Sequence, residues 1–167
     1  MIEVNYIGAW QWHWSKFGIL VNVSVQASEI FQSNRQFGYH TCERGGQLFI
    51  GIDQLGEFWL FATPPHSLDK SGRTWLELDN SRCKSEIIEA NACGLRLVGY
   101  WHTHPQEVPT LSSQDVLSLT AFSDRNKDTL QNPLAVIVGR SSKKEGIRAW
   151  SHRSSELQSL AYHKEKP

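Results

Sequence analysis

The chain of 167 residues contains 40% hydrophobic and 20% charged residues, which is typical of a globular protein and excludes an intrinsically disordered one. Lysine and arginine together number 17, as do aspartate and glutamate. The sequence therefore lacks the basic excess of many nucleic-acid-binding proteins, and we expect no nucleic-acid partner.

The length predicts a single domain over residues 1–167 with a buried core. The three cysteines, Cys42, Cys83 and Cys93, are odd in number and form no C-x-x-C pair, so a disulfide framework is not expected. The N-terminus lacks the basic and apolar regions of a signal peptide, and no apolar run reaches the roughly 20 residues that span a bilayer. These features predict a cytoplasmic protein without membrane contact.

The N-terminal segment carries tryptophans at alternate positions, Trp10, Trp12 and Trp14. A period of two places their rings on one face of a strand, which we expect to pack on the core. A second strand is expected over 17–23. Ser24 is then predicted to cap a helix of about a dozen residues with an apolar face.

The next part of the sequence predicts a hairpin, with strands over 47–52 and 57–62 joined by a turn at 53–56. The glycine pair at 45–46 indicates either a sharp change of direction or a close approach of two backbone segments. Residues 63–78 form a longer connection. This connection is a candidate for substrate contact, although an ordinary surface loop is as plausible.

The second half predicts two longer helices, three strands and a short C-terminal helix. The longer helices are expected from Asp79 or Asn80 to Gly94 and over 112–126. The strands are expected over 95–101, 134–139 and 147–151, and the C-terminal helix over 156–162. Cys83 and Cys93 are expected to be small core residues.

The strand over 95–101 leads directly into His102-Thr-His104-Pro105. Residues two apart on a strand point to the same face, so the two imidazoles can be presented together. Pro105 cannot donate to a strand ladder and should end the strand. Two histidines and a carboxylate, here Asp115, form the three-ligand set of catalytic zinc, which keeps a position for water.

Asp115 also has a structural interpretation, because Ser112-Ser-Gln-Asp115 fits a capping box that starts a helix. Taken alone, the four residues favour the capping box over a metal ligand. The complete pattern, H-x-H-P, six residues, then S-x-x-D, is much more specific and favours the metal ligand.

These residues resemble the JAMM (MPN-plus, or JAB) zinc metalloproteases, whose signature is H-x-H-P-x6-S-x-x-D with an upstream glutamate. The upstream motif is similar to Glu43-Arg-Gly45-Gly46, which lies 59 residues before His102. The resemblance covers about residues 17–151. It implies an α/β (α+β) fold of cytidine-deaminase-like architecture, in which helices flank a mixed, partly curled β-sheet.

The resemblance also implies a mechanism. His102, His104 and Asp115 would hold Zn²⁺, Glu43 would take a proton from water and pass it to the leaving amine, and Ser112 would hydrogen-bond the developing oxyanion. The implied substrate is the peptide or isopeptide bond after the C-terminal tail of a ubiquitin-like protein or of a conjugated target protein.

The chain resembles the stand-alone bacterial JAMM isopeptidases of CBASS anti-phage operons in three features: its length, the connection that contains Pro64-Pro65, and the sequence Trp101-His-Thr-His-Pro. That resemblance implies reversal of the conjugation of a cyclic-nucleotide synthase, in a pathway with an E1/E2-like partner. Similar peptidases of other bacterial ubiquitin-like systems remain an alternative.

Two other classes compete with an isopeptidase. In a non-catalytic MPN-type binding module, the histidines would be structural and Asp115 would only cap a helix. A RadC-like nucleic-acid-associated relative is disfavoured by the balanced charge and by Glu43. His40 and Cys42, close to Glu43 in sequence, could lie near the site, whereas His13, His66, His152 and His163 are expected to be ordinary surface or core residues.

Overall fold

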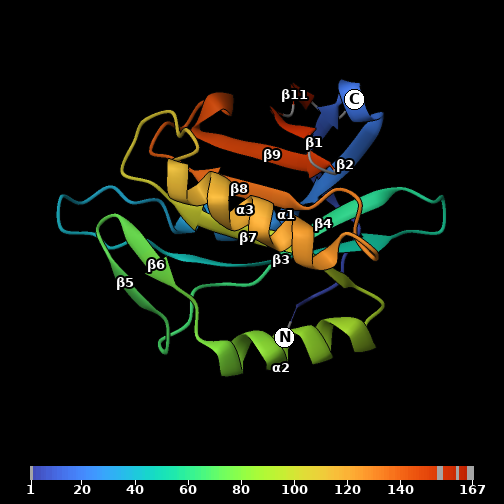
Figure 1. Ribbon diagram of the computed structural model, residues 1–167, viewed down its shortest axis with the longest axis horizontal. Coiled ribbons are helices and arrows are strands. Elements are labelled where there is room, and N and C mark those ends of the chain that lie inside the picture. The colour runs from blue at the N-terminus through green and yellow to red at the C-terminus, as the bar shows by residue number, and fades with distance from the viewer. Residues whose placement is uncertain (1, 154–155, 161, 165–167) are drawn as a thin grey trace.

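A computed structural model describes residues 2–153, 156–160 and 162–164. The protein consists of one large mixed β-sheet with helices on both faces (Figure 1). The helices are α1 (Val25–Ser33), α2 (Asn80–Ala92) and α3 (Ser113–Asn126), with short 3-10 turns at Ser15–Phe17 and Lys144–Gly146. The strands are β1 (Gly8–Trp14), β2 (Ile19–Ser24), β3 (Gly45–Ile52), β4 (Phe58–Ala62), β5 (Lys70–Gly72), β6 (Trp75–Glu77), β7 (Arg96–Thr103), β8 (Leu134–Val138), β9 (Ile147–Arg153), β10 (Glu156–Leu160) and β11 (Tyr162–Lys164). None of the helices in the described ranges is long and apolar enough to cross a membrane.

The main sheet has nine strands in the order β10-β9-β8-β7-β3-β4-β2-β1-β11. The β2–β4 and β7–β8 pairs are parallel and the other neighbours are antiparallel. Strands β5 and β6 form a separate hairpin at one end of the molecule. The predicted mixed, curled sheet flanked by helices is confirmed.

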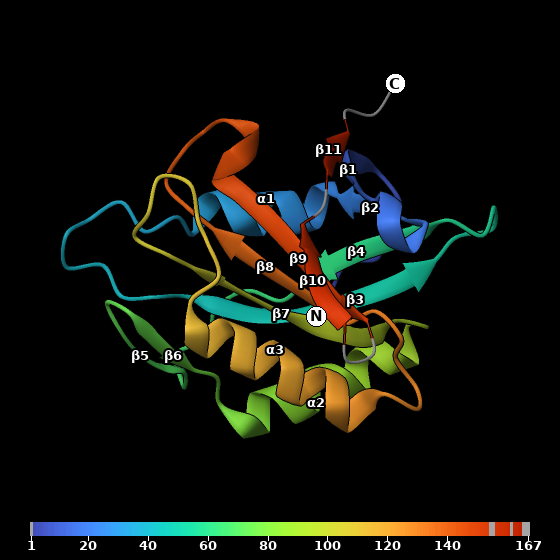
Figure 2. The same ribbon diagram turned by 45° about the horizontal axis from the view of Figure 1, so that its top comes forward.

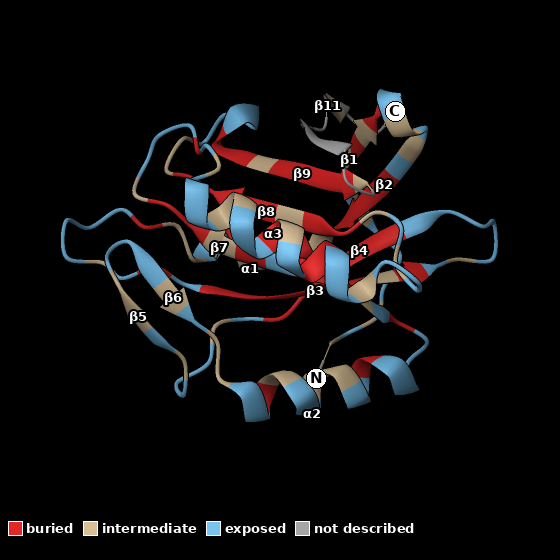
Figure 3. Ribbon diagram, in the orientation of Figure 1, coloured by how far each residue is buried: buried red, intermediate tan, exposed pale blue. Residues whose placement is uncertain are grey.

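Side chains alternate between two apolar layers along the central strands, as the period of a strand requires. On β4, Leu60 and Ala62 join a cluster with α1 and the three tryptophans of β1, whereas Trp59 and Phe61 join a cluster under α2. Helix α3 covers a third cluster on the same side as α2 (Figure 2). The central strands are accordingly buried, while the β5–β6 hairpin and the β3–β4 turn are largely exposed (Figure 3).

Several local predictions are confirmed. Trp12 and Trp14 are almost completely buried, and Ser24 caps α1 by accepting a hydrogen bond from the Ala27 amide at 3.1 Å. Helix α1 has nine residues and is shorter than expected, and the side chains of Ser33 and Asn34 donate to carbonyl oxygens of its last turns.

Other predictions are wrong or are decided by the structure. The predicted helix over 156–162 is wrong, because residues 156–160 form β10, which pairs with the edge of β9. Cys93 is exposed at the end of α2 and is not a core residue. The connection over 63–78 contains the β5–β6 hairpin. The glycine pair at 45–46 lies inside β3 and reflects close approach, since a Cβ on Gly46 would lie 2.2 Å from the Thr63 carbonyl oxygen.

A buried cation ties α2 to the sheet. The Arg82 guanidinium lies 2.8 Å from Asp69 Oδ2 and 2.7 Å from Glu86 Oε1. It also donates to the Gly45 carbonyl oxygen and to Thr63 Oγ1, both at 3.2 Å. Burial raises the pKa of Asp69, but hydrogen bonds, the first from Arg82, outweigh it and hold the pKa below its ordinary value. This network fixes the chain that enters β3, immediately after Glu43.

Replacing Arg82 by methionine should lower the free energy of unfolding by about 3–5 kcal/mol, because the buried Asp69 carboxylate loses its cation. Urea unfolding measures this change. The stabilisation from Asp69 should be present above the unfolded carboxyl pKa of about 3.9 and be lost as the pH falls through the lower folded value. As a control, Glu107→Gln, which breaks only the exposed pair with Arg140, should cost less than about 1 kcal/mol. Equal losses in the two variants would contradict the assignment.

Candidate metal centre

The two motif histidines lie at the end of β7, which runs between β3 and β8 in the middle of the sheet. His102 is paired with Gly45 of β3, and the His104 amide donates to the Val138 carbonyl oxygen at 2.9 Å. Hydrogen bonds on both sides therefore hold the backbone of the two histidines. Because they are two residues apart, their imidazoles share a face, and their Nε2 atoms lie 3.0 Å from each other.

Asp115 reaches the histidines from the first turn of α3. Ser112 and Asp115 form the predicted capping box, in which Ser112 Oγ accepts from the Asp115 amide at 3.1 Å and Asp115 Oδ2 accepts from the Ser112 amide at 2.8 Å. The same carboxylate lies 3.0 Å from His102 Nε2 and 3.3 Å from His104 Nε2. The capping role and the position beside the histidines are therefore compatible.

The donor set of this cluster fits a metal ion. The ligand atoms of His102, His104 and Asp115 all lie within 4.8 Å of one another. Two imidazole lone pairs and a carboxylate at this separation repel each other unless a cation or a proton lies between them. Two nitrogens and one carboxylate oxygen match the protein ligands of catalytic zinc.

The charges of the cluster are strongly coupled. Burial raises the pKa of Asp115, but the interactions of its carboxylate with His102 and His104 outweigh burial and hold the pKa far below its ordinary value. Burial lowers the pKa of His104, but hydrogen bonds with Asp115 and Gln106 raise it above the ordinary value. Asp115 is thus an ionised carboxylate at neutral pH, as a metal ligand must be.

Glu43 lies next to the cluster because the β3–β7 register continues before β3 begins. The Thr103 amide donates to the Arg44 carbonyl oxygen at 2.8 Å, and the Arg44 amide donates to Thr103 Oγ1 at 3.0 Å. Glu43 is therefore opposite His104 and shares its face of the sheet. The Glu43 amide donates to the Gly72 carbonyl oxygen of the β5–β6 hairpin at 2.7 Å. Backbone contacts on two sides thus set its position.

Glu43 is only 6% exposed, unlike a solvated loop glutamate. Burial, supported by the negative charge of Asp115, raises the pKa of Glu43 against the opposing effect of His102 and His104. Gly45 lies opposite His102 and permits the close packing of β3 against β7, because a Cβ there would lie 2.3 Å from the Trp101 carbonyl oxygen.

A polar network behind the cluster was not predictable from the motif. Thr103 Oγ1 donates to Gln36 Oε1 at 3.0 Å, and Gln36 Nε2 donates at 2.8 Å to the carbonyl oxygens of Thr41 and Arg73. Gln36 and Thr103 are both buried. The alternation of the strand indicates that Thr103 faces away from the histidines, but no sequence signal identifies Gln36. These bonds join the loop before Glu43 to β7 and to the hairpin.

The remaining candidates are distributed around this centre. Ser112 is exposed at the N-cap of α3. His40 and Cys42 are both exposed, and within the described ranges neither joins the group of side chains that could hold a metal. His152 is buried, where its Nδ1 lies 2.9 Å from Ser123 Oγ. The sequence also missed Gln106, whose Oε1 lies 3.0 Å from His104 Nδ1.

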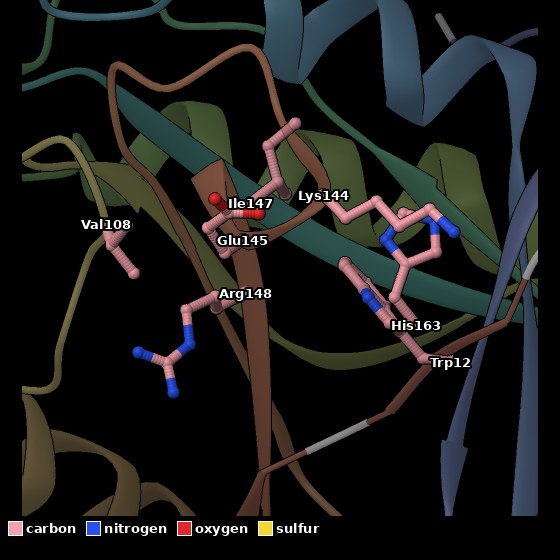
Figure 4. Close-up of a pocket in the computed structure, with 7 residues that line it drawn as sticks. All are labelled: Trp12, Val108, Lys144, Glu145, Ile147, Arg148 and His163. Carbon is pink, nitrogen blue, oxygen red and sulfur yellow. The ribbon is translucent and has the colours of Figure 1, made fainter.

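A cavity of about 430 Å³ lies between β1, β9, β11 and the loop that precedes α3 (Figure 4). Its lining consists of Trp12, Val108, Lys144, Glu145, Ile147, Arg148 and His163. None of the three candidate ligands is among them, so the metal centre lies outside this cavity.

Comparison with known proteins agrees with this geometry. A protein of Pseudomonas aeruginosa (strain BWHPSA011 / Pa011) named CD-NTase/cGAS isopeptidase is 29% identical over 126 residues, which is 74% of this chain and 79% of that protein. The solution structure of a protein from Desulfitobacterium hafniense superposes with a TM-score of 0.54 over 87% of this chain and 90% of that one, at 16% identity, and so shares the fold. Residues 29–153, which include Glu43 and the three candidate ligands, match the family of prokaryotic homologs of the JAB domain. The predicted resemblance is confirmed, and the chain belongs to this family of prokaryotic JAB-domain homologs.

Proposed function

We propose that this protein is a zinc-dependent isopeptidase. The observation that carries the proposal is the convergence of His102, His104 and Asp115, whose ligand atoms lie within 4.8 Å of one another beside the buried carboxylate of Glu43. In this proposal Nε2 of both histidines and the Asp115 carboxylate hold the zinc. When bound, the metal would supply Lewis acidity that polarises a carbonyl group and makes water more acidic.

Glu43 is the proposed general base and acid. A carboxylate accepts a proton from the attacking water most effectively when its pKa approaches the working pH, and burial raises the pKa of Glu43 in that direction. The same group can then return the proton to the leaving amine. Its backbone bond to Gly72 holds the base in place without using the carboxylate oxygens.

Ser112 is the proposed donor to the oxyanion. Its Oγ accepts a hydrogen bond from the Asp115 amide, and this bond leaves the hydroxyl hydrogen available for donation. The residue is exposed, so a substrate carbonyl group can approach it. A donor placed at the developing charge stabilises the transition state more than the ground state.

The proposed substrate is an isopeptide bond after the C-terminal tail of a conjugated protein. The Pseudomonas aeruginosa relative is named as an isopeptidase of CD-NTase/cGAS. We therefore propose a conjugated CD-NTase as the target, with an E1/E2-like enzyme forming the conjugate in bacterial anti-phage defence. Release of another bacterial ubiquitin-like protein is the alternative. The free thiols of Cys42, Cys83 and Cys93 fit a cytoplasmic setting.

The metal assignment predicts about one zinc ion per chain and its loss in Asp115→Asn. Asparagine can still accept from the Ser112 amide, so the helix cap should change stability by less than about 1 kcal/mol, whereas a neutral amide is a poor zinc ligand. Elemental analysis after dialysis measures the zinc. Asp124→Asn, on the exposed side of α3, is the matched control and should keep its zinc. Equal zinc content in both variants would remove Asp115 from the metal site, and a zinc-free wild type would favour the non-catalytic binding module.

The base assignment predicts that Glu43→Gln loses cleavage by about 10²–10⁴-fold and keeps its zinc. The assay follows the release of a tail-linked fusion of a CD-NTase or of a ubiquitin-like protein by gel, with a chelator-treated sample beside it. Glu29→Gln, an exposed position on α1, should cleave like the wild type. Cleavage by Glu43→Gln at the wild-type rate would exclude Glu43 as the base.

The oxyanion assignment predicts that Ser112→Ala reduces kcat by about 10²–10³-fold. Loss of the N-cap accounts for about 1 kcal/mol of stability in addition. Ser24→Ala removes the serine cap of α1 and separates the two effects, because it should lose stability without loss of kcat. Similar kcat values for the two alanine variants would show that Ser112 acts only as a cap.

A further inference from the structure

Gln106, the second residue after His104, contacts the imidazole on the side opposite the metal cluster. Its Oε1 lies 3.0 Å from His104 Nδ1 and accepts from the Thr110 amide at 3.2 Å. A backbone amide can only donate, so the atom that faces Thr110 must be the oxygen of the glutamine amide. That oxygen has no hydrogen, and His104 Nδ1 must therefore be the donor in their shared bond.

This assignment determines the tautomer of a neutral His104. With the hydrogen on Nδ1, the lone pair lies on Nε2. Nε2 is the atom that faces the cluster, 3.3 Å from Asp115 Oδ2 and 3.0 Å from His102 Nε2. The opposite tautomer would place a hydrogen where a metal ligand needs an electron pair.

The backbone around Gln106 is held in place, although its side chain is exposed. The Arg140 amide donates to the Gln106 carbonyl oxygen at 2.8 Å, and the Ser141 amide donates to the next carbonyl oxygen, that of Glu107, at 3.1 Å. Gly139 permits this approach, since a Cβ there would lie 2.7 Å from both of these oxygens. The loop after the histidines thus continues the pairing of β7 with β8, and Gln106 starts from a fixed position.

We infer that Gln106 is a positioning residue that fixes the tautomer and ring orientation of His104, so that Nε2 is presented to the metal. The inference rests on the proposed zinc centre and adds to it a residue outside the ligand set. Outer partners of this kind typically change metal affinity by about 10- to 100-fold. The effect on zinc affinity should depend on an oxygen acceptor in the side chain of residue 106, so a glutamate should replace the glutamine without loss.

The first test is independent of zinc. Long-range proton–nitrogen NMR of the imidazoles is recorded on metal-free protein at high pH in the Asp115→Asn background, which removes the charged acceptor at His104 Nε2 and keeps the helix cap. Asp115→Asn alone and Asp115→Asn with Gln106→Glu should carry the His104 hydrogen on Nδ1, whereas adding Gln106→Leu should abolish this preference. Gln131→Leu, at an exposed position before β8, should leave the tautomer of Asp115→Asn unchanged. An unchanged His104 tautomer on adding Gln106→Leu would overturn the inference.

The second test measures zinc affinity by competition with a chromogenic chelator. Gln106→Leu should bind zinc about 10- to 100-fold more weakly than the wild type, and Gln106→Glu and Gln131→Leu should bind with near wild-type affinity. Equal weakening in the leucine and glutamate variants would also overturn the inference. If the wild type does not bind zinc, the metal centre itself fails, and the tautomer comparison still decides whether Gln106 orients His104.

Discussion

The antiparallel pairing of β3 with β7 places both halves of the candidate site. These strands lie in the middle of the nine-stranded sheet, and the register that pairs Gly45 with His102 carries Glu43 to the position opposite His104. A shift of one residue would turn Glu43 to the opposite face of the sheet. The close fit of Gly46 against the Thr63 carbonyl oxygen and the Arg82 bond to Gly45 both oppose such a shift. The position of the proposed base thus depends on the core and not on the loop that carries it.

The site also brings together groups that repel each other electrostatically. Two carboxylates, Glu43 and Asp115, and the lone pairs of two imidazoles occupy a partly buried region, and the negative charge of Asp115 contributes to the raised pKa of Glu43. The fold supports this arrangement with hydrogen bonds to backbone groups. The capping box holds Asp115, strand ladders hold the histidines, and Gly72 holds the backbone of Glu43. A cation in the cluster would remove much of the remaining repulsion.

The sequence predicted those parts of the molecule that follow a local pattern. The alternation of Trp10, Trp12 and Trp14 predicted a buried strand face, and the spacing of the motif predicted that Asp115 would start a helix near the histidines. The backbone pairing that would place Glu43 beside them could not be derived from its neighbours, because the register depends on contacts 59 residues apart. Only the family resemblance linked Glu43 to the motif.

The misses share one origin, because each depends on the packing or pairing of a segment in the folded chain, which its local sequence pattern does not show. Residues 156–160 become a strand because β9 offers an open edge. Cys93 is apolar enough for a core but lies where α2 ends at the surface. Gln36 has no local feature that indicates its bonds to Thr103 and Arg73.

The two outermost strands of the sheet, β10 and β11, are consecutive in the chain and pair with β9 and β1 at opposite ends of the strand order. One residue separates Leu160 from Tyr162, so their Cα atoms can be no more than about 7 Å apart. The two ends of the sheet are therefore tethered to each other by the polypeptide itself, and the sheet cannot flatten without releasing one of these strands. The curvature of the sheet therefore depends on chain connectivity as well as on packing. The curved sheet packs around the apolar cluster that contains Trp10, Trp12 and Trp14.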